Sequence, residues 1–267
     1  MDAVEVVRKF YDESFELEWE RMERHPIEFE LTKRFLGRYI RPGDRILDLG
    51  GGPGRYALHF AKLGCDVTLA DLSQGNVDFA VAKAKELDLP LRALQADARD
   101  PAALRDELFD HVLMMGPLYH LMEEPDRIKA VDACLTLLKP GGTLSCTFIS
   151  SYAGILYYMK EAPEEIITPL GQDELSHFLA DKPFSGAAFT QAYFIRRADV
   201  LPFMARFPLE KLHFLGCEGL LSPNELTLCA QPKEVFDAWI DIAEKVNERE
   251  DLLSFSEHFL YIGKKIG

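Results

Sequence analysis

Short apolar runs alternate with helically spaced apolar positions between residues 44 and 149. The run Ile46 to Leu49 is typical of a buried parallel strand, and Arg55 to Leu63 places its apolar side chains at helical intervals. Further strands are expected at 66–71, 94–97, 109–116 and after residue 142. Strands and helices that alternate in this way predict an α/β fold, a doubly wound parallel sheet with helices on both faces. A chain of 267 residues suits one such domain.

A glycine-rich turn separates the first predicted strand from its helix. Four glycines occupy five positions, Gly50, Gly51, Gly52 and Gly54. Glycine permits positive φ and the close approach of a ligand. A strand, a glycine turn and a helix together indicate a nucleotide site that faces the helix N-terminus. A P-loop is excluded, because no G-x-x-x-x-G-K-[ST] pattern occurs and Arg55 follows Gly54.

Two interpretations of this turn predict different nucleotides. Gly52, Gly54 and Ala57 satisfy the G-x-G-x-x-G/A pattern of dehydrogenases, which is weak evidence alone. Asp48 and the glycines also read D-x-G-x-G-x-G, and on this pattern the sequence resembles the class I S-adenosylmethionine-dependent methyltransferases. The resemblance covers residues 41 to 150 and favours S-adenosylmethionine over NAD.

Four further places carry the resemblance. The strand 66–71 ends in Asp71, whose carboxylate in this family accepts the ribose hydroxyls, and Asp97 ends the next strand, where the family reaches the adenine amino group. Met114 and Met115 end the fourth strand, and residues 137–142 form the helix stop before the fifth. The resemblance implies a Rossmann-like, mostly parallel seven-stranded sheet. The apolar residues at 258–263 predict a last strand that could lie against the sheet edge. The cofactor-binding residues implied in the core are Gly50, Gly51, Gly52, Asp71, Leu72, Asp97, Ala98 and Met115.

Segments outside residues 41–150 are expected to cover this core within a single methyltransferase domain, 1–267. Residues 1–40 are amphipathic and predict a helical lid, and residues 151–196 and 222–256 predict cap insertions. In the lid, Tyr11 is a candidate cofactor contact, and Arg24 could pair with the methionine carboxylate. A solvated surface arginine is the alternative for Arg24. An aromatic cap favours a small or medium organic acceptor in a dry pocket.

Methyl transfer from a sulfonium requires an aligned acceptor and little water, and it needs a base only when the acceptor holds a proton. The segment 116–120 follows the fourth strand, where this fold opens towards the transferred methyl group. There His120 is a candidate base and Tyr119 could orient the acceptor. A packed loop histidine is the alternative for His120, and His177 in the cap is a weaker candidate. The acceptor atom, O, N or S, stays open.

Charge and cysteine content indicate which partners and which compartment the protein is expected to have. The net charge is −14, with six acids against three bases in 151–196 and eight against three in 222–256, which disfavours a nucleic acid. Five scattered cysteines without C-x-x-C spacing predict neither a metal site nor disulfides, but a reducing compartment. The acidic start is unlike a signal peptide, so we expect a cytoplasmic protein. Residues 141–159 carry no charge, but their glycine, serine and threonine residues favour a buried strand over a membrane span.

Two alternatives to a small-molecule methyltransferase stay open. A tRNA or protein methyltransferase would need a partner that supplies the missing basic surface. A non-catalytic S-adenosylmethionine-binding module would keep the glycines, Asp71 and Asp97 without an acceptor. The sequence does not indicate an oligomeric state.

Overall fold

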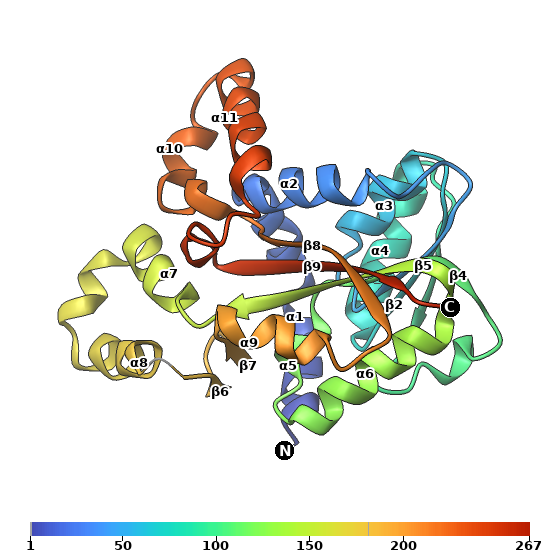
Figure 1. Cartoon of the computed structure of the whole chain (residues 1–267), viewed down its shortest axis with the longest axis horizontal. Helices are drawn as coiled ribbons and strands as arrows, with labels where there is room; N and C mark the ends of the chain where they lie inside the picture. Colours follow the sequence, from blue (N-terminus) through green and yellow to red (C-terminus); the bar gives the residue numbers. More distant parts are fainter. Residues whose placement is uncertain (1, 181) are drawn as a thin grey trace.

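A computed structural model of the chain describes residues 2–180 and 182–267. The central sheet runs through the middle of the molecule (Figure 1). Five of its strands are parallel and lie in the order β3-β2-β1-β4-β5. These strands are β1 (Arg45–Leu49), β2 (Asp66–Asp71), β3 (Arg92–Gln95), β4 (Phe109–Met114) and β5 (Leu138–Ser150). This doubly wound arrangement confirms the predicted fold class.

The C-terminal strand does not lie at the sheet edge, which corrects its predicted place. β9 (His258–Lys265) runs antiparallel between β5 and β8 (Leu209–Gly216), so both of its edges are hydrogen-bonded. With β8 and β9 the sheet has the seven strands implied by the resemblance.

A hairpin adds two strands to the seven that the resemblance implies. β6 (Phe184–Ala187) pairs with β7 (Gln191–Ile195), and β7 pairs in parallel with the last two residues of β5. Part of the insertion 151–196 is therefore a continuation of the sheet.

Helices cover both faces of the sheet because alternate residues of each strand point to opposite sides. Ile46 joins one buried apolar cluster, with Phe35 and Phe60, whereas Leu47 joins the other, with Val131 and Val200. The helices of the core are α3 (Arg55–Lys62), α4 (Gln74–Glu86), α5 (Pro117–His120), α6 (Glu124–Leu137) and α9 (Arg197–Met204), with a 3₁₀ turn η1 (Ala102–Leu104).

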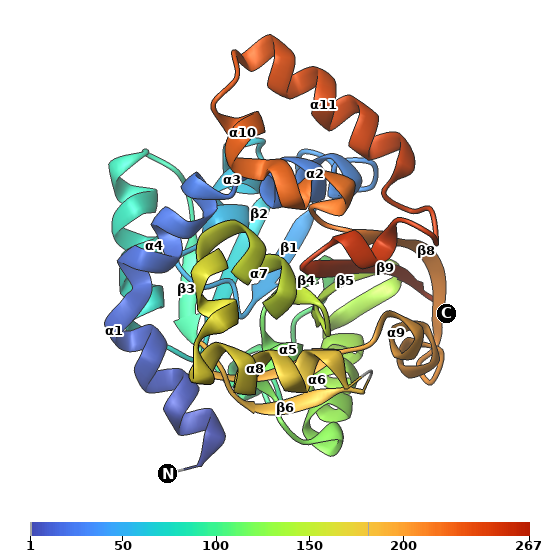
Figure 2. The same ribbon diagram turned by 90° about the vertical axis from the view of Figure 1, so that its left-hand side faces the viewer.

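Three sets of helices lie outside this core (Figure 2). At the N-terminus, α1 (Ala3–Arg24) crosses α4, and α2 (Pro26–Leu36) follows it. Residues 153–179 form α7 (Ala153–Glu161), η2 (Pro163–Ile167) and α8 (Pro169–Leu179). The third set packs against α2 and comprises η3 (Gly219–Asn224), α10 (Glu225–Cys229), α11 (Lys233–Val246) and η4 (Leu253–Phe255). Over residues 2–180 and 182–267, none of the helices combines the length and apolar character needed to cross a bilayer.

Candidate cofactor and active site

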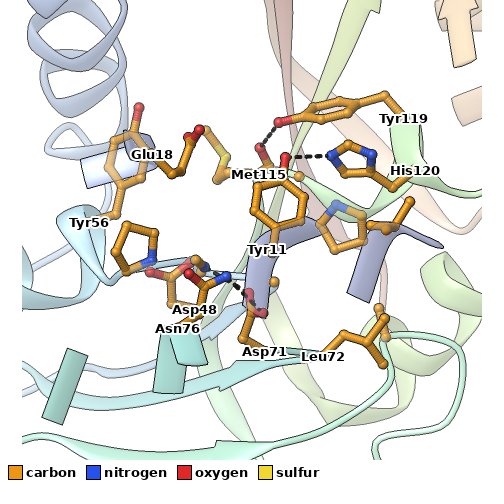
Figure 3. A pocket seen from close by; sticks show the side chains of 18 of the residues that line it. Tyr11, Glu18, Asp48, Tyr56, Asp71, Leu72, Asn76, Met115, Tyr119 and His120 are labelled. Carbon is orange, nitrogen blue, oxygen red and sulfur yellow. Dashed lines mark hydrogen bonds between the residues drawn. The ribbon is translucent and has the colours of Figure 1, made fainter. Parts of the chain in front are cut away.

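A cavity opens at the carboxyl ends of β1, β2 and β4, beneath α1 (Figure 3). It encloses about 1030 Å³ when the space open to solvent is included. The carboxyl ends of parallel strands are the usual ligand site of open α/β sheets. Most site residues proposed from the sequence line it, namely Tyr11, Gly50, Gly51, Gly52, Asp71, Leu72, Asp97, Ala98, Met115, Tyr119 and His120.

The glycine turn forms the floor of the cavity. Gly50 has a φ of +71°, and a Cβ there would lie 2.3 Å from the Pro117 side chain. Gly52 has a φ of +56°, and a Cβ there would meet no atom within 4 Å, so its α-carbon faces open space. This turn can therefore cradle a ligand that larger residues would exclude.

Asp71 holds the glycine turn to the start of α4. One carboxylate oxygen accepts a hydrogen bond from the Gly52 backbone N–H at 2.8 Å. The other accepts from the Ser73 backbone N–H at 2.8 Å and from Asn76 Nδ2 at 3.1 Å. Burial raises the pKa of Asp71 despite these bonds. The carboxylate thus reaches the cavity in a fixed orientation.

Three buried oxygens in the cavity wall, Asp48 Oδ1, Asn76 Oδ1 and the Tyr56 hydroxyl, have no hydrogen-bond partner among the described residues. Asp48 accepts from the Ala57 backbone N–H through Oδ2 at 3.1 Å, while its Oδ1 accepts nothing, and Asn76 Oδ1 is also unsatisfied. Burial raises the pKa of Asp48 to about 7. Unsatisfied buried acceptors are costly, so this wall suits a ligand that brings donors.

Asp97 is engaged by Arg99 beside the cavity. Arg99 Nη2 lies 2.7 Å from Asp97 Oδ2, and Arg99 Nη1 lies 3.0 Å from Asp126. Partial burial acts to raise the pKa of Asp97, but the hydrogen bonds from Arg99 outweigh it and the pKa lies below its usual value. Asp97 is therefore ionised and oriented by its neighbour.

His120 and Tyr11 close one side of the cavity. His120 Nδ1 lies 3.0 Å from the Gln191 carbonyl oxygen, so Nδ1 donates and Nε2 accepts from the Tyr11 hydroxyl at 2.9 Å. Burial lowers the pKa of His120 to about 4, which makes the ring neutral. The Tyr119 hydroxyl donates to the Met115 carbonyl at 3.1 Å, and burial raises the Tyr119 pKa. Tyr11 thus covers the one nitrogen of His120 that can accept a proton.

Comparison with known proteins decides which nucleotide the glycine turn serves. A family model described as "Methyltransferase domain" matches residues 46–142. A "Ubiquinone biosynthesis O-methyltransferase" of Xanthomonas campestris pv. campestris is 31% identical over 165 residues, which cover 61% of this chain and 67% of the relative. The protein of the same name from Dinoroseobacter shibae is 34% identical over 153 residues, 51% of this chain and 58% of the relative.

The chain belongs to the class I S-adenosylmethionine-dependent methyltransferases.

Solved structures agree with this fold. An S-adenosylmethionine-dependent methyltransferase from Clostridium acetobutylicum superposes with a TM-score of 0.60 at 14% identity, covering 91% of this chain and 92% of that one. The N-methyltransferase NodS from Bradyrhizobium japonicum, in complex with S-adenosyl-L-homocysteine, gives 0.54 at 14% identity, covering 92% and 90%. The cofactor of this methyltransferase is S-adenosylmethionine, and the dehydrogenase alternative is wrong.

The position of Arg24 corrects one proposed contact. Arg24 pairs with Glu20 at 3.6 Å, its side chain is 58% exposed, and it does not line the cavity. Arg21, three residues earlier, does line it. Its guanidinium contacts Glu18 at 2.9 Å and Glu28 at 3.2 Å. The spacing of Tyr11, Glu18 and Arg21 on one helix face could have indicated this residue.

Hydrogen bonds to Asp12 hold α1 over the cavity, just N-terminal to a kink in this helix. Asp12 Oδ1 accepts from Ser73 Oγ at 2.7 Å and from the Gly75 backbone N–H at 3.3 Å, beside the start of α4. The helix leaves helical geometry at Ser14, where φ is −125° and ψ is 16°. Tyr11 and Arg21 thus enter the cavity from the two sides of this kink.

The proposed caps contribute no described residue to the cavity wall. Phe189 and Gln191 of the hairpin contact His120. The ring of His177 in α8 lies against Phe184 of β6 and does not line the cavity. Segment 222–256 packs on the outer side of α2. The roles of these segments as caps and of 1–40 as a lid stay proposals.

Proposed function

We propose that this methyltransferase methylates the oxygen of an acidic hydroxyl, such as a phenol, on a small organic acceptor. The observation that carries the proposal is the neutral Tyr11–His120 pair in the cavity wall, beside Met115 at the end of β4. The names of the relatives, O-methyltransferases of ubiquinone biosynthesis, support oxygen as the acceptor atom.

S-adenosylmethionine supplies a methyl group on a positively charged sulfur, and the sulfur keeps the bonding electron pair when the methyl group leaves. The protein binds the cofactor, aligns the acceptor and excludes water from the site. Asp71 and the glycine turn would hold the nucleoside, and Asp97 with Ala98 would take the adenine. Tyr11 and Tyr119 would exclude water from the reacting atoms.

His120 Nε2 is the proposed destination of the acceptor's proton. A base with a pKa of about 4 is weak, and each unit that separates it from the acceptor costs about 1.4 kcal/mol. A phenol, with a pKa of about 10, is therefore a far better acceptor than an aliphatic alcohol. The proton travels through the Tyr11 hydroxyl, which lies between the cavity and the ring.

The test is a panel of acceptors at equal concentration, comprising phenols and catechols, aliphatic alcohols, thiols and amines. S-adenosylhomocysteine formation measures turnover, and NMR of the product identifies the methylated atom. We expect only the phenols and catechols to be methylated, and the products to be their aryl methyl ethers. Tyr11→Phe should then lower kcat, because the relay loses its hydroxyl. Methylation of only amines or thiols would refute the proposal.

We further propose that the acceptor is not a nucleic acid and that the enzyme works in a reducing compartment, the cytoplasm. The acid excess of 151–196 and 222–256 supports the first point. The five cysteines support the second, since all are free thiols and four are buried. The tRNA or protein methyltransferase stays the alternative for the acceptor class.

A further inference from the structure

A chain of alternating charges runs from β9 to the cavity. His258 Nδ1 lies 2.7 Å from Glu218 Oε1 and 3.8 Å from Glu28 Oε2. Glu28 Oε2 in turn lies 3.2 Å from Arg21 Nη1. The Glu28 and Glu218 side chains are only 8% and 4% exposed, so their interactions are weakly screened by solvent.

The end of this series of charges at Glu218 and His258 is held in a fixed position. Glu218 Oε2 accepts hydrogen bonds from Ser256 Oγ and from the backbone N–H groups of Glu257 and His258. The carboxylate is thereby fixed to the start of β9, and the His258 ring is fixed to the carboxylate. Only Glu28 and Arg21 of the four charged residues line the cavity, so His258 acts on Arg21 through Glu28, and its ring also contacts Tyr119 of the cavity wall.

The net charge of this cluster depends on the protonation of His258. Glu18, Glu28 and Glu218 face Arg21 and His258, and the adjoining pair of Lys160 and Glu257 adds no net charge. The cluster therefore has a net charge of −1 when the imidazole is protonated and −2 when it is not. The carboxylate of S-adenosylmethionine would be repelled by the more negative cluster. With His258 charged, Glu28 has a second cationic partner and competes less with a ligand for the Arg21 guanidinium.

We propose that Glu218, His258 and Glu28 are positioning residues that hold Arg21 towards the amino-acid end of S-adenosylmethionine, where Arg21 binds the carboxylate. The proposal rests on the cofactor assignment and adds to it the means by which β9 and α2 orient a residue of α1. The fork geometry of arginine suits a bidentate contact with a ligand carboxylate.

A metal site is the competing interpretation of the same cluster. The candidate ligand atoms of Glu28, Glu218 and His258 lie within 4.8 Å of one another. However, His258 Nδ1 donates its proton to Glu218, and Arg21 already neutralises Glu28. A metal would need that nitrogen deprotonated and would lie close to the Arg21 cation.

Two ligands that differ at the amino-acid end test the proposal by titration calorimetry. S-adenosylhomocysteine carries the carboxylate, whereas 5′-methylthioadenosine lacks the whole amino-acid group. In His258→Gln, S-adenosylhomocysteine affinity should fall about tenfold, which corresponds to about 1.4 kcal/mol. Affinity for 5′-methylthioadenosine should stay within about twofold of wild type. Arg21→Lys should show the same selectivity.

His213→Gln is the matched control. This histidine also pairs with a glutamate, Glu248, at 2.9 Å, and it lies on β8 outside the cavity wall. Both ligands should bind this control as they bind wild type. A parallel loss of both ligands in His258→Gln, or full S-adenosylhomocysteine affinity in a folded His258→Gln protein, would overturn the positioning role. Loss of binding on addition of a chelator would overturn it in favour of a metal. Failure of wild type to bind S-adenosylhomocysteine would instead refute the cofactor assignment.

Discussion

Replacement of Asp71 separates two tasks of one carboxylate, holding the glycine turn and binding the cofactor. Asp71→Ala leaves three donors without their acceptor, the Gly52 and Ser73 backbone N–H groups and Asn76 Nδ2. Each unsatisfied buried donor costs about 1–3 kcal/mol. Gly52 faces the cavity and can bond to water, so two donors carry the cost. Removal of the buried charge offsets part of this cost, and we expect the free energy of unfolding to fall by about 2–3 kcal/mol.

Asp71→Asn is the more informative variant. The amide oxygen can keep the bonds from Ser73 and Asn76, which share one carboxylate oxygen, while the NH₂ group replaces the acceptor of the Gly52 N–H. The loss of stability should be about 1 kcal/mol. The lost charged acceptor for the ribose should cost about 1.5–3 kcal/mol of cofactor binding, or about 10- to 150-fold in Kd.

Urea denaturation and titration with S-adenosylhomocysteine measure the two effects separately. Asp78→Asn is the control, because Asp78 lies on α4, the helix that follows Asp71, and accepts a hydrogen bond from Gln74 on the surface. Wild-type affinity in a folded Asp71→Asn protein would refute the ribose assignment. An equal loss in Asp78→Asn would show that the effect is not specific to the site.

Three further predictions concern other parts of the chain. His120→Asn should lower kcat by about 10²–10⁴-fold while S-adenosylhomocysteine binding survives; activity that falls only in step with the folded fraction would exclude His120 as the base. The His258 pKa, which desolvation lowers but Glu28 and Glu218 raise, is about 9 in the folded state. Protonated His258 should contribute fully to the free energy of unfolding below about pH 6.5, the pKa of histidine in the unfolded state, and this contribution should be lost as the pH rises through 9. Urea midpoints of His258→Gln that follow the same pH curve as wild type would contradict this. A mobility-shift assay at about 50 mM salt should show no bulk tRNA binding, and a tight, salt-sensitive complex would promote the tRNA methyltransferase alternative.

The features that the sequence predicted well are local ones. The first strand, the glycine turn and the next helix depend on contiguous residues, and their bounds in the structure differ from the expected ones by one residue. Parallel strands bring their carboxyl ends to one edge, which is why Asp71, Asp97 and Met115 were expected together and line one cavity.

The features that were missed depend on phase or on distant contacts. Arg24 was chosen because it precedes the helix break at Pro26, whereas helical spacing from Tyr11 selects Arg21, which lines the cavity while Arg24 faces solvent. The pairing of Glu28 with His258 joins residues 230 positions apart, and no periodicity reports it. The place of β9 between two strands likewise depends on which edge of β5 is free, a property of the assembled sheet.

The length of β5 has a consequence for hydrogen exchange. Its last residue, Ser150, donates to the Glu257 carbonyl at 2.8 Å, and Ser151 donates to Ile195 of β7 at 2.9 Å. These amides open only if the centre of the sheet opens, so the hairpin should exchange its β7 amides at the slow rate of global unfolding. The helix α8 carries no such bonds to the sheet and exposes Leu170 and Leu179. Its amides should exchange by local opening, so that one insertion divides into a slowly and a rapidly exchanging part.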